Sequence, residues 1–354
     1  MRKSPFRVVA ASALAVLLCL LVLPPASQAQ TQIIGAGSTF VYPIMTHWIQ
    51  AFQAKNPGVQ INYQSIGSGG GIQQLRKGLV DFGASDVALT DEQLKEMPAL
   101  VQVPESAGPV CITYNLPELS SPLTLTSEAL TDIFLGKVTK WNDPAIVKSN
   151  PGVKLPDTAI LVAHRSDGSG TTGIFTTFLS AVSPEWKQQV GAAISVKWPV
   201  GLGGKGSEGV TGVVKQMPGT IGYVELSYAD ENHLPVVLVG NKAGKFIAPS
   251  AASATAAIDA FRKELAKDVR TPIVNPPASA PDAYPISGLT FLLVPKSSND
   301  PHKQEMTKKF IEYIVTDGQS FSTGLHYAMI PASISKLDHQ LLAQVGSSNT
   351  QAMK

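Results

Sequence analysis

The stretch Arg165-Ser-Asp-Gly-Ser-Gly-Thr171 follows the short apolar run Ala159-Ile-Leu-Val-Ala163. Such a run is typical of a strand that is buried on both faces. Glycines permit a tight turn, and the hydroxyl groups of Ser169 and Thr171 can cap the helix that the apolar spacing beyond them predicts. The positive end of that helix would then lie beside Arg165. The stretch predicts either an anion-binding site or an ordinary strand–turn–helix corner with an exposed arginine.

Two other junctions between a predicted strand and a predicted helix have a similar composition. Gly35-Ala-Gly-Ser-Thr-Phe40 presents the Thr39 hydroxyl and the Phe40 N–H group, and Gly67-Ser-Gly-Gly-Gly71 presents Ser68. Either junction alone could be a structural cap, since caps need Ser or Thr and tight turns need Gly. In open α/β sheets, however, ligands bind beyond the carboxyl ends of the strands. Three such junctions in one chain therefore favour a shared ligand site.

Strands and helices are predicted to alternate along most of the chain, which indicates α/β architecture with mostly parallel sheets. The predicted strands are 33–36, 59–63, 82–84, 109–115, 159–163, 221–224, 236–239 and 286–294. The predicted helices are 40–54, 71–80, 91–96, 128–135, a helix after 171, 251–265, 303–315 and 333–345. The strands at 109–115 and 286–294 are expected to be two crossings between domains. Domain I would comprise residues 30–112 plus 288–354, and domain II residues 113–287.

The first 29 residues have the features of a secretory signal peptide. Three basic residues precede an apolar run from Val8 to Leu23, and the small-residue end Ser27-Gln-Ala29 predicts cleavage after Ala29. The alternative, a membrane anchor, is disfavoured because the run is short for a stable crossing. Cys19 lies inside the apolar run and lacks the small preceding residues of a lipid-attachment site. Residues 1–29 are therefore predicted to direct export.

The composition of the remaining chain bounds the possible functions. It carries 25 Lys+Arg against 26 Asp+Glu, so no electrostatic case for nucleic-acid binding remains. About 325 residues exceed what one hydrophobic core usually supports, which indicates two domains. Cys111 is the one cysteine outside the signal peptide, so no internal disulfide is possible. Its apolar neighbours predict a small buried core residue.

The stretch Asp81-Phe-Gly-Ala-Ser-Asp86 places a carboxylate near the predicted anion site. Asp86 could cap the next helix or simply be solvated. Alternatively, an ionised carboxylate only accepts hydrogen bonds, so it would bind an oxyanion that still carries a proton and repel one that does not. Protonated phosphate meets this requirement, whereas fully ionised sulfate does not.

The order of these motifs resembles that of the periplasmic phosphate-binding proteins, the receptors of high-affinity phosphate ABC importers. The resemblance runs from Gly35 to the strand near Phe291, and it also includes Val196–Gly206 and Gly219–Glu225. It implies the two-domain periplasmic binding protein fold, in which each domain is a mostly parallel sheet flanked by helices. Two chain crossings would join the domains, with the ligand in the cleft between them.

The resemblance also implies a set of ligand-binding residues: Thr39, Phe40, Ser68, Asp86, Arg165, Ser169, Gly170 and Thr171. The four hydroxyl groups and the N–H groups of Phe40 and Gly170 would donate hydrogen bonds. Arg165 would supply a charged fork, and Asp86 would accept the proton of phosphate. Gly69 stands where some family members have a second serine. No catalytic residue, metal or cofactor is implied; the implied partners are inorganic phosphate and the membrane subunits of a phosphate ABC transporter, and the protein would be a periplasmic monomer.

Two other functions are alternatives for an anion site in this chain: an exported phosphatase-like hydrolase, and a receptor for another oxyanion such as sulfate or molybdate. The six histidines show no metal-ligand spacing, and no serine lies in a nucleophile motif. His164 is the one histidine expected within reach of the site. Asp167 would either orient the guanidinium of Arg165 or cap the turn. The run Gly201–Gly209 lacks Walker spacing and is expected to be a structural loop at the cleft rim.

Overall fold

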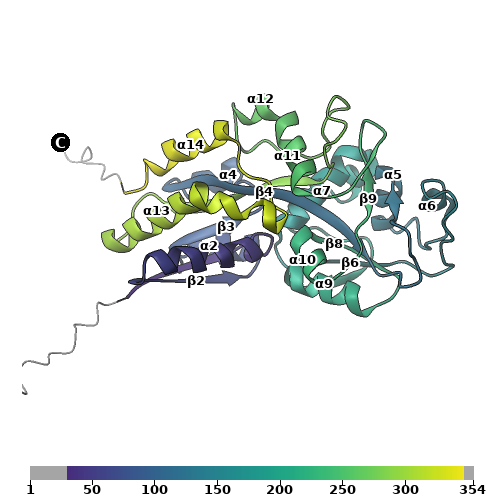
Figure 1. Ribbon diagram of the computed structural model, residues 1–354, viewed down its shortest axis with the longest axis horizontal. Coiled ribbons are helices and arrows are strands. Elements are labelled where there is room, and N and C mark those ends of the chain that lie inside the picture. The colour runs from purple at the N-terminus through teal and green to yellow at the C-terminus, as the bar shows by residue number, and fades with distance from the viewer. Residues whose placement is uncertain (1–29, 347–354) are drawn as a thin grey trace, which may run out of the picture.

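A single mixed sheet of eight strands runs through the molecule in the computed structural model, which describes residues 30–346 (Figure 1). Its strand order is β2-β1-β3-β11-β4-β8-β6-β7. The strands are β1 Thr31–Gly37, β2 Val59–Ser65, β3 Phe82–Ser85, β4 Leu100–Tyr114, β6 Leu161–Arg165, β7 Leu202–Gly204, β8 Thr220–Glu225 and β11 Ser287–Pro295. A small second sheet contains β5 Thr124–Leu125, β9 Leu238–Gly240 and β10 Phe246–Ile247.

The two central strands, β4 and β11, are antiparallel and separate two groups of parallel strands. On one side β3, β1 and β2 are parallel, and on the other side β8, β6 and β7 are parallel. The first part of β4 pairs with β11, and its last part, from Val110 to Tyr114, pairs with β8. β4 therefore passes from one parallel group to the other. The predicted α/β fold with mostly parallel strand groups is confirmed.

The strand predicted at 109–115 is only the end of the 15-residue β4. Its first part was missed because Pro104, Glu105 and Ser106 interrupt the apolar pattern. In the structure these residues lie where the register between β4 and β11 shifts, opposite Thr290 and Phe291. Such a bulge accommodates an extra residue in one strand without ending it.

Helices cover both parallel groups (Figure 1). They are α2 Tyr42–Lys55, α3 Ser68–Arg76, α4 Asp91–Glu96, α5 Ser127–Phe134, α6 Pro144–Val147, α7 Gly170–Val182, α8 Pro184–Gln189, α9 Gly206–Gln216, α10 Leu226–Glu231, α11 Ala251–Ala260, α12 Arg262–Leu265, α13 Pro301–Val315 and α14 Ala332–Leu342. Short 3₁₀ turns span Asp317–Phe321 and Thr323–Leu325.

Three predictions about helices need correction, the first two because glycine does not always end a helix. The helix expected at 71–80 begins at Ser68, since the glycines 69–71 are helical, and it ends at Arg76. Part of the run expected to be a loop, Gly201–Gly209, forms the start of α9. The helix expected at 251–265 is two helices, α11 and α12.

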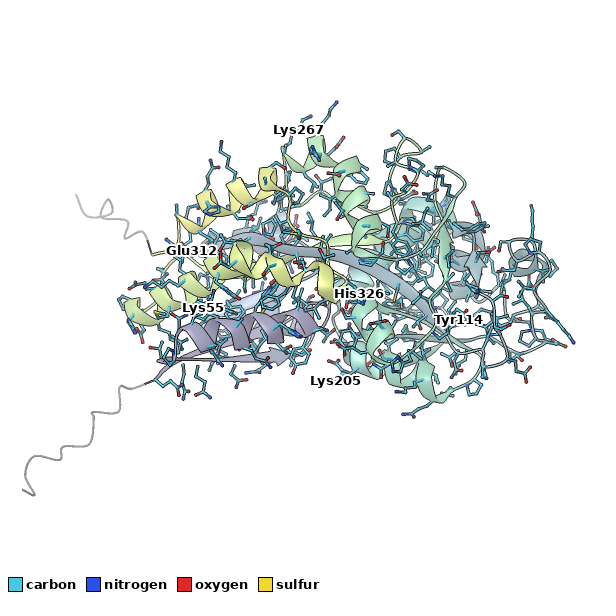
Figure 2. All side chains as sticks on the ribbon, viewed as in Figure 1. Lys55, Tyr114, Lys205, Lys267, Glu312 and His326 are labelled. Carbon is cyan, nitrogen blue, oxygen red and sulfur yellow. The ribbon has the colours of Figure 1, made fainter. Side chains whose placement is uncertain are left out.

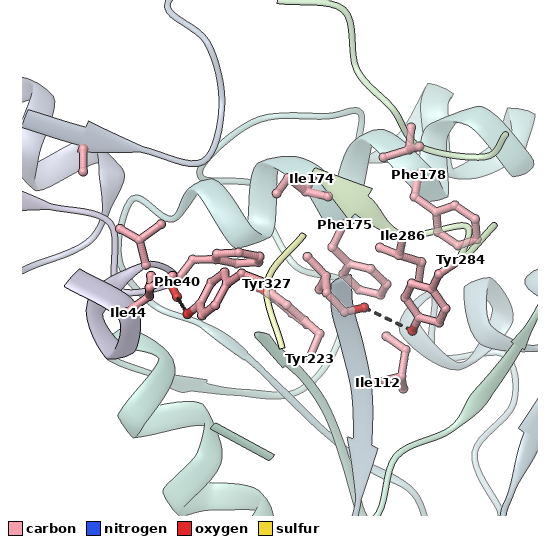
Figure 3. Packing of buried hydrophobic residues seen from close by; sticks show 14 of the residues in the cluster. Phe40, Ile44, Ile112, Ile174, Phe175, Phe178, Tyr223, Tyr284, Ile286 and Tyr327 are labelled. Atoms are coloured by element: carbon pink, nitrogen blue, oxygen red, sulfur yellow. Dashed lines mark hydrogen bonds between the residues drawn. The ribbon is translucent and has the colours of Figure 1, made fainter. Parts of the chain in front are cut away.

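A hydrophobic cluster rich in aromatic residues lies against the sheet (Figure 3). The rings of Phe175 and Tyr223 stack with centroids 4.6 Å apart, and the edge of Phe40 meets Tyr327 at 6.0 Å. The Tyr327 hydroxyl also donates to the Phe40 carbonyl at 2.6 Å. Cys111 is buried and free, as predicted. This packing fixes the backbone at the ends of β1 and β6.

Many charged side chains lie on the outside, as Lys55, Lys205 and Lys267 illustrate (Figure 2). Among residues 30–346, no helix has both the length and the apolar character needed to cross a membrane. The predicted signal peptide at 1–29 and the predicted frayed end beyond Gly346 lie outside the described residues.

Candidate anion-binding site

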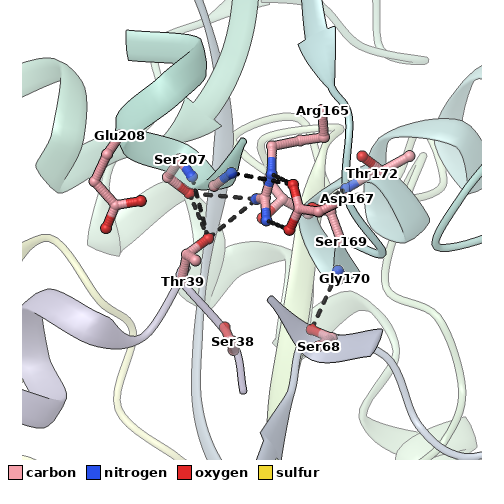
Figure 4. Close-up of polar contacts among 12 residues, drawn as sticks. Ser38, Thr39, Ser68, Arg165, Asp167, Ser169, Gly170, Thr172, Ser207 and Glu208 are labelled. Atoms are coloured by element: carbon pink, nitrogen blue, oxygen red, sulfur yellow. Dashed lines mark hydrogen bonds and ion pairs between the residues drawn. The ribbon is translucent and has the colours of Figure 1, made fainter. Parts of the chain in front are cut away.

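Arg165 ends β6 with its side chain held by Asp167, two residues further on (Figure 4). Its Nε donates to Asp167 Oδ1 at 2.8 Å, and its Nη2 donates to Oδ2 at 2.6 Å. The Gly206 N–H adds a bond to Oδ1 at 3.1 Å. Burial alone would lower the pKa of Arg165, but Asp167 raises it. This bidentate pair fixes a buried positive charge at the carboxyl end of the strand.

The third guanidinium nitrogen of Arg165 faces two hydroxyl groups. Nη1 donates to Thr39 Oγ1 at 3.0 Å and lies 3.5 Å from Ser207 Oγ. The two hydroxyl oxygens are 2.8 Å apart, and the Ser207 N–H also donates to Thr39 Oγ1 at 3.3 Å. Thr39 follows β1, whereas Ser207 begins α9, so this cluster joins the two strand groups.

A second contact between the groups is centred on Ser68 at the start of α3. Its hydroxyl oxygen accepts from the Gly170 N–H at 3.1 Å and from the Asp86 N–H at 3.2 Å. Next to it, the Gly69 N–H donates to the Gly168 carbonyl at 2.9 Å. A Cβ atom on Gly69 would lie only 3.1 Å from Gly168 Cα. The absence of the second serine at position 69 thus permits this close approach.

Asp86 lies just beyond β3 and is buried, with 3 % of its surface exposed. The Ser38 hydroxyl donates to its Oδ1, and the Thr171 hydroxyl donates to its Oδ2 at 3.3 Å. Burial raises the pKa of Asp86 to about 6, while Ser38, the charge of Arg165 and Thr171 oppose that rise. In these surroundings, the buried carboxylate of Asp86 remains a strong hydrogen-bond acceptor near neutral pH.

The start of α7 completes the cluster. The Ser169 hydroxyl oxygen caps the helix by accepting from the Thr172 N–H at 3.1 Å, so its proton can be donated elsewhere. Tyr223 supports both neighbouring elements, since it accepts from the Arg165 N–H at 3.1 Å and shares a 2.6 Å bond with Thr172. The positive end of the 13-residue α7 therefore points at Asp86 and Ser68 from a rigid base.

The eight predicted site residues come together in this one region. Arg165, Ser169, Gly170 and Thr171 come from β6 and α7, and Thr39, Phe40, Ser68 and Asp86 come from the group of β1, β2 and β3. The Nε and Nη2 atoms of Arg165 engage Asp167, which leaves the Nη1 side for other groups. Whether the eight bind a ligand stays a prediction.

Two members of the cluster were not predicted. Ser38 immediately precedes Thr39, and no role was assigned to it from the sequence. Ser207 was assigned to a structural loop, although Gly206-Ser207 repeats the glycine–hydroxyl pattern of the other helix starts. That pattern could have indicated it.

The other two candidates from the sequence, Asp167 and His164, contact neighbouring side chains of the protein. Asp167 orients the guanidinium, in agreement with one of its two predicted roles. The His164 ring stacks on Trp198 with centroids 4.9 Å apart, and burial lowers its pKa. Among the described residues, no group of three or more His, Cys, Asp or Glu side chains is placed to hold a metal ion.

The fold and the site define an α/β protein whose two strand groups meet at a buried cluster of hydroxyl, N–H and charged groups. The chain matches the model of the PBP superfamily domain over residues 24–318. It is 44% identical over 315 residues to the phosphate-binding protein PstS of Xylella fastidiosa, covering 88% of this chain and 85% of that protein. It is 43% identical over 329 residues to PstS of Pasteurella multocida, covering 92% and 94%. The chain belongs to the PBP superfamily and, within it, to the PstS family of phosphate-binding proteins.

Solved structures agree with this fold. A high affinity periplasmic phosphate-binding protein (PfluDING) bound with phosphate has a TM-score of 0.68 at 22% identity, over 87% of this chain and 93% of that one. An ABC-type phosphate transport receptor from Vibrio cholerae has a TM-score of 0.53 at 20% identity, over 84% of this chain and all of that one. At these identities the likeness concerns the fold.

Proposed function

We propose that this protein is the receptor that binds inorganic phosphate outside the cytoplasmic membrane and delivers it to an ABC importer. The proposed ligand-binding residues are the eight predicted ones: Thr39, Phe40, Ser68, Asp86, Arg165, Ser169, Gly170 and Thr171. The names of its relatives as phosphate-binding proteins support this function and disfavour an enzyme.

The observation that carries the proposal is the buried carboxylate of Asp86 beside donors that would hold an anion. The formal charges of Arg165, Asp167 and Asp86 sum to −1. Net charge therefore does not favour the binding of a dianion. Binding must come from hydroxyl groups, N–H groups and helix ends, with Asp86 accepting a proton that the ligand carries. HPO₄²⁻ offers that proton at neutral pH, and sulfate does not.

The alternative functions lack such support. A hydrolase needs a nucleophile paired with a base, but the Ser169 hydroxyl caps α7 and His164 stacks on Trp198. A sulfate receptor would place a fully ionised oxyanion against Asp86, where two acceptors would face each other without a proton.

Two parallel measurements test the proposal. Equilibrium binding of phosphate and of sulfate at neutral pH should show tight phosphate binding and weak sulfate binding, while an aryl phosphate should not be turned over. Comparable affinities for the two anions would overturn the selectivity argument. Turnover that is lost on substitution of Ser169 would overturn the receptor function.

The substitution Asp86→Asn tests the origin of selectivity. The amide can donate a hydrogen bond, so sulfate should gain affinity relative to phosphate by at least tenfold, the order expected when an unpaired buried acceptor is removed. Competition binding measures the ratio. Asp317→Asn, at a largely exposed carboxylate, is the matched control and should leave it unchanged. Unchanged selectivity in Asp86→Asn would show that shape or other donors decide it.

The wider setting is part of the proposal. The partners would be the membrane subunits of a phosphate ABC transporter, and the protein would act as a periplasmic monomer after removal of residues 1–29. The domains would be 30–112 plus 288–354 and 113–287, closing on the anion as a hinge. Contacts between the strand groups support closure, including the Tyr228 hydroxyl of α10, which donates to the Thr39 carbonyl at 2.7 Å.

A further inference from the structure

Ser38 is fully buried, and its hydroxyl group makes two hydrogen bonds inside the protein. Its oxygen accepts from the Val41 N–H at 3.3 Å, and its proton is donated to Asp86 Oδ1. The backbone is fixed as well, because the Ser38 N–H donates to Ala84 at 2.9 Å and its carbonyl accepts from the Tyr63 hydroxyl at 2.8 Å. The serine is thus built to donate to Asp86.

We propose that Ser38 is a specificity-determining residue: it keeps Asp86 an acceptor, and so sets the pH range in which the site distinguishes protonated from unprotonated tetrahedral oxyanions. The inference rests on the proposed phosphate-binding function. It assigns Ser38 a role through Asp86, whether or not Ser38 also contacts the ligand.

The surroundings of Asp86 explain why such a donor matters. Burial is the largest influence on the carboxyl group and favours its neutral form, with a pKa of about 6, and Ser38 is the first of the groups that oppose it. Arg165 on β6 also favours the charged form, and Thr171 on α7 bonds the other oxygen. Two acidic groups, Glu105 on β4 and Tyr63 on β2, interact with Asp86 electrostatically, and their anions would favour its neutral form.

Loss of the Ser38 hydroxyl would therefore move the pKa of Asp86 upward, toward neutral pH. A neutral carboxyl group carries a proton of its own and can donate it to an oxyanion that has none. Sulfate would then become an acceptable ligand at a pH where the unmodified protein rejects it. The Ser38 hydroxyl group would thus control selectivity, because it decides whether the ligand or Asp86 supplies the proton of the hydrogen bond between them.

The test compares the unmodified protein with Ser38→Ala, Ser38→Thr and Ser253→Ala, using calorimetric titration with phosphate and with sulfate from pH 5.5 to 8.5. In the unmodified protein, sulfate affinity should rise as the pH falls from 8.5 toward about 6 and should level off below that pH. In Ser38→Ala it should level off at a higher pH, and the sulfate-to-phosphate affinity ratio at pH 7 should be about tenfold larger, as for a shift of one pKa unit. Ser38→Thr keeps the hydroxyl group and should restore the original profile. Ser253→Ala removes a hydroxyl group in α11, outside the site, and should change nothing.

A carbon-13 NMR titration of the carboxyl groups in the ligand-free proteins is the second readout, and it applies even where binding is lost. Ser38→Gly, which removes the same hydroxyl group, serves if the alanine variant does not fold. An equal loss of affinity for both anions at every pH, with the Asp86 titration unmoved, would overturn the inference and indicate a structural role. Failure of the unmodified protein to prefer phosphate would instead overturn the proposed function itself.

Discussion

At the scale of single residues, the positive charge of Arg165 is balanced by a neighbouring carboxylate. The residue is 4 % exposed, and the Asp167 carboxylate holds two of the three guanidinium nitrogens. The charge is therefore largely compensated before any ligand is considered. What Arg165 offers an oxyanion is a fixed donor, with a smaller contribution from net charge.

Replacing Arg165 with alanine should weaken phosphate binding by roughly 10- to 100-fold, the range expected for losing hydrogen bonds to a charged group. Affinity should persist, because the hydroxyl groups and helix ends remain. Titration calorimetry measures the change. Arg262→Ala is the matched control, since Arg262 also pairs with an aspartate, Asp259, but at the surface of the molecule. Phosphate affinity unchanged by Arg165→Ala would remove this residue from the site.

Sequence patterns predicted the residues of the cluster where each follows a strand and starts a helix. Thr39, Ser68 and Ser169 stand at such junctions, so their type and position were enough. Ser38 and Ser207 were not predicted, because their roles depend on contacts with distant residues. The glycine–hydroxyl pattern at Gly206-Ser207 could have indicated a helix start, but no local pattern reports the contact of Ser207 with Thr39, 168 residues away in the chain.

At the scale of elements, the position of Ser207 depends on how closely α9 packs on β7. A Cβ atom on Gly204 of β7 would lie 2.5 Å from the Gly209 carbonyl carbon and 2.6 Å from Val210 N, both in the backbone of α9. The backbones of β7 and α9 therefore lie in direct contact, which the glycine-rich run 201–209 makes possible.

Gly204→Ala should separate β7 from α9. We expect a loss of about 1–3 kcal/mol in the free energy of unfolding, as for an overpacked core, and weaker phosphate binding because Ser207 moves. Gly212→Ala, in the same helix, is the matched control: nothing lies within 4 Å of its added methyl group. It should stabilise the protein by about 0.5–1 kcal/mol. Denaturant unfolding measures both; equal effects of the two substitutions would contradict the packing argument.

Most elements could be predicted from the sequence because their periodicity is local. The helix α4, for example, has the predicted bounds, and Thr90 caps it. The length of β4 could not be predicted, because Glu105 breaks its apolar pattern and only pairing with β11 reveals that the strand continues. Likewise, the glycines at 69–71 in α3 are typical of a loop, and only the structure shows the contact of Gly69 with Gly168.

At the scale of the whole molecule, the continuous sheet means that the two strand groups share β4 and β11. The domain boundaries at 112/113 and 287/288 stay a prediction. Ala254 and Ile258 of α11 pack in one cluster with Ile72 and Leu289. The helix thus packs in one cluster with residues of the other predicted domain, and its main contacts are with β4 and β11.

The molecule also buries several carboxyl groups whose pKa values burial raises. The values for Glu225 and Asp338 rise to about 8, and that for Asp86 rises to about 6. Glu225 has partners in the Ser227 N–H and the Tyr327 hydroxyl. Neither carboxyl oxygen of Asp338 has a hydrogen-bond partner among residues 30–346.

These groups predict that the phosphate-free protein loses stability as the pH rises from 5 to 8. Over this range the unfolded chain has already released protons that the folded protein still holds, because the folded pKa values lie higher. For each such group the free energy of unfolding should fall by up to about 1.4 kcal/mol per pH unit between the unfolded and folded values. Asp338→Asn removes one of them, so its stability should decline less steeply, as denaturant unfolding at pH 5, 6.5 and 8 would measure. Asp282→Asn, at a carboxylate that is 79 % exposed, should keep the original slope. If Asp338→Asn also keeps that slope, the Asp338 side chain is ionised in the folded protein and its burial is relieved by a route other than protonation.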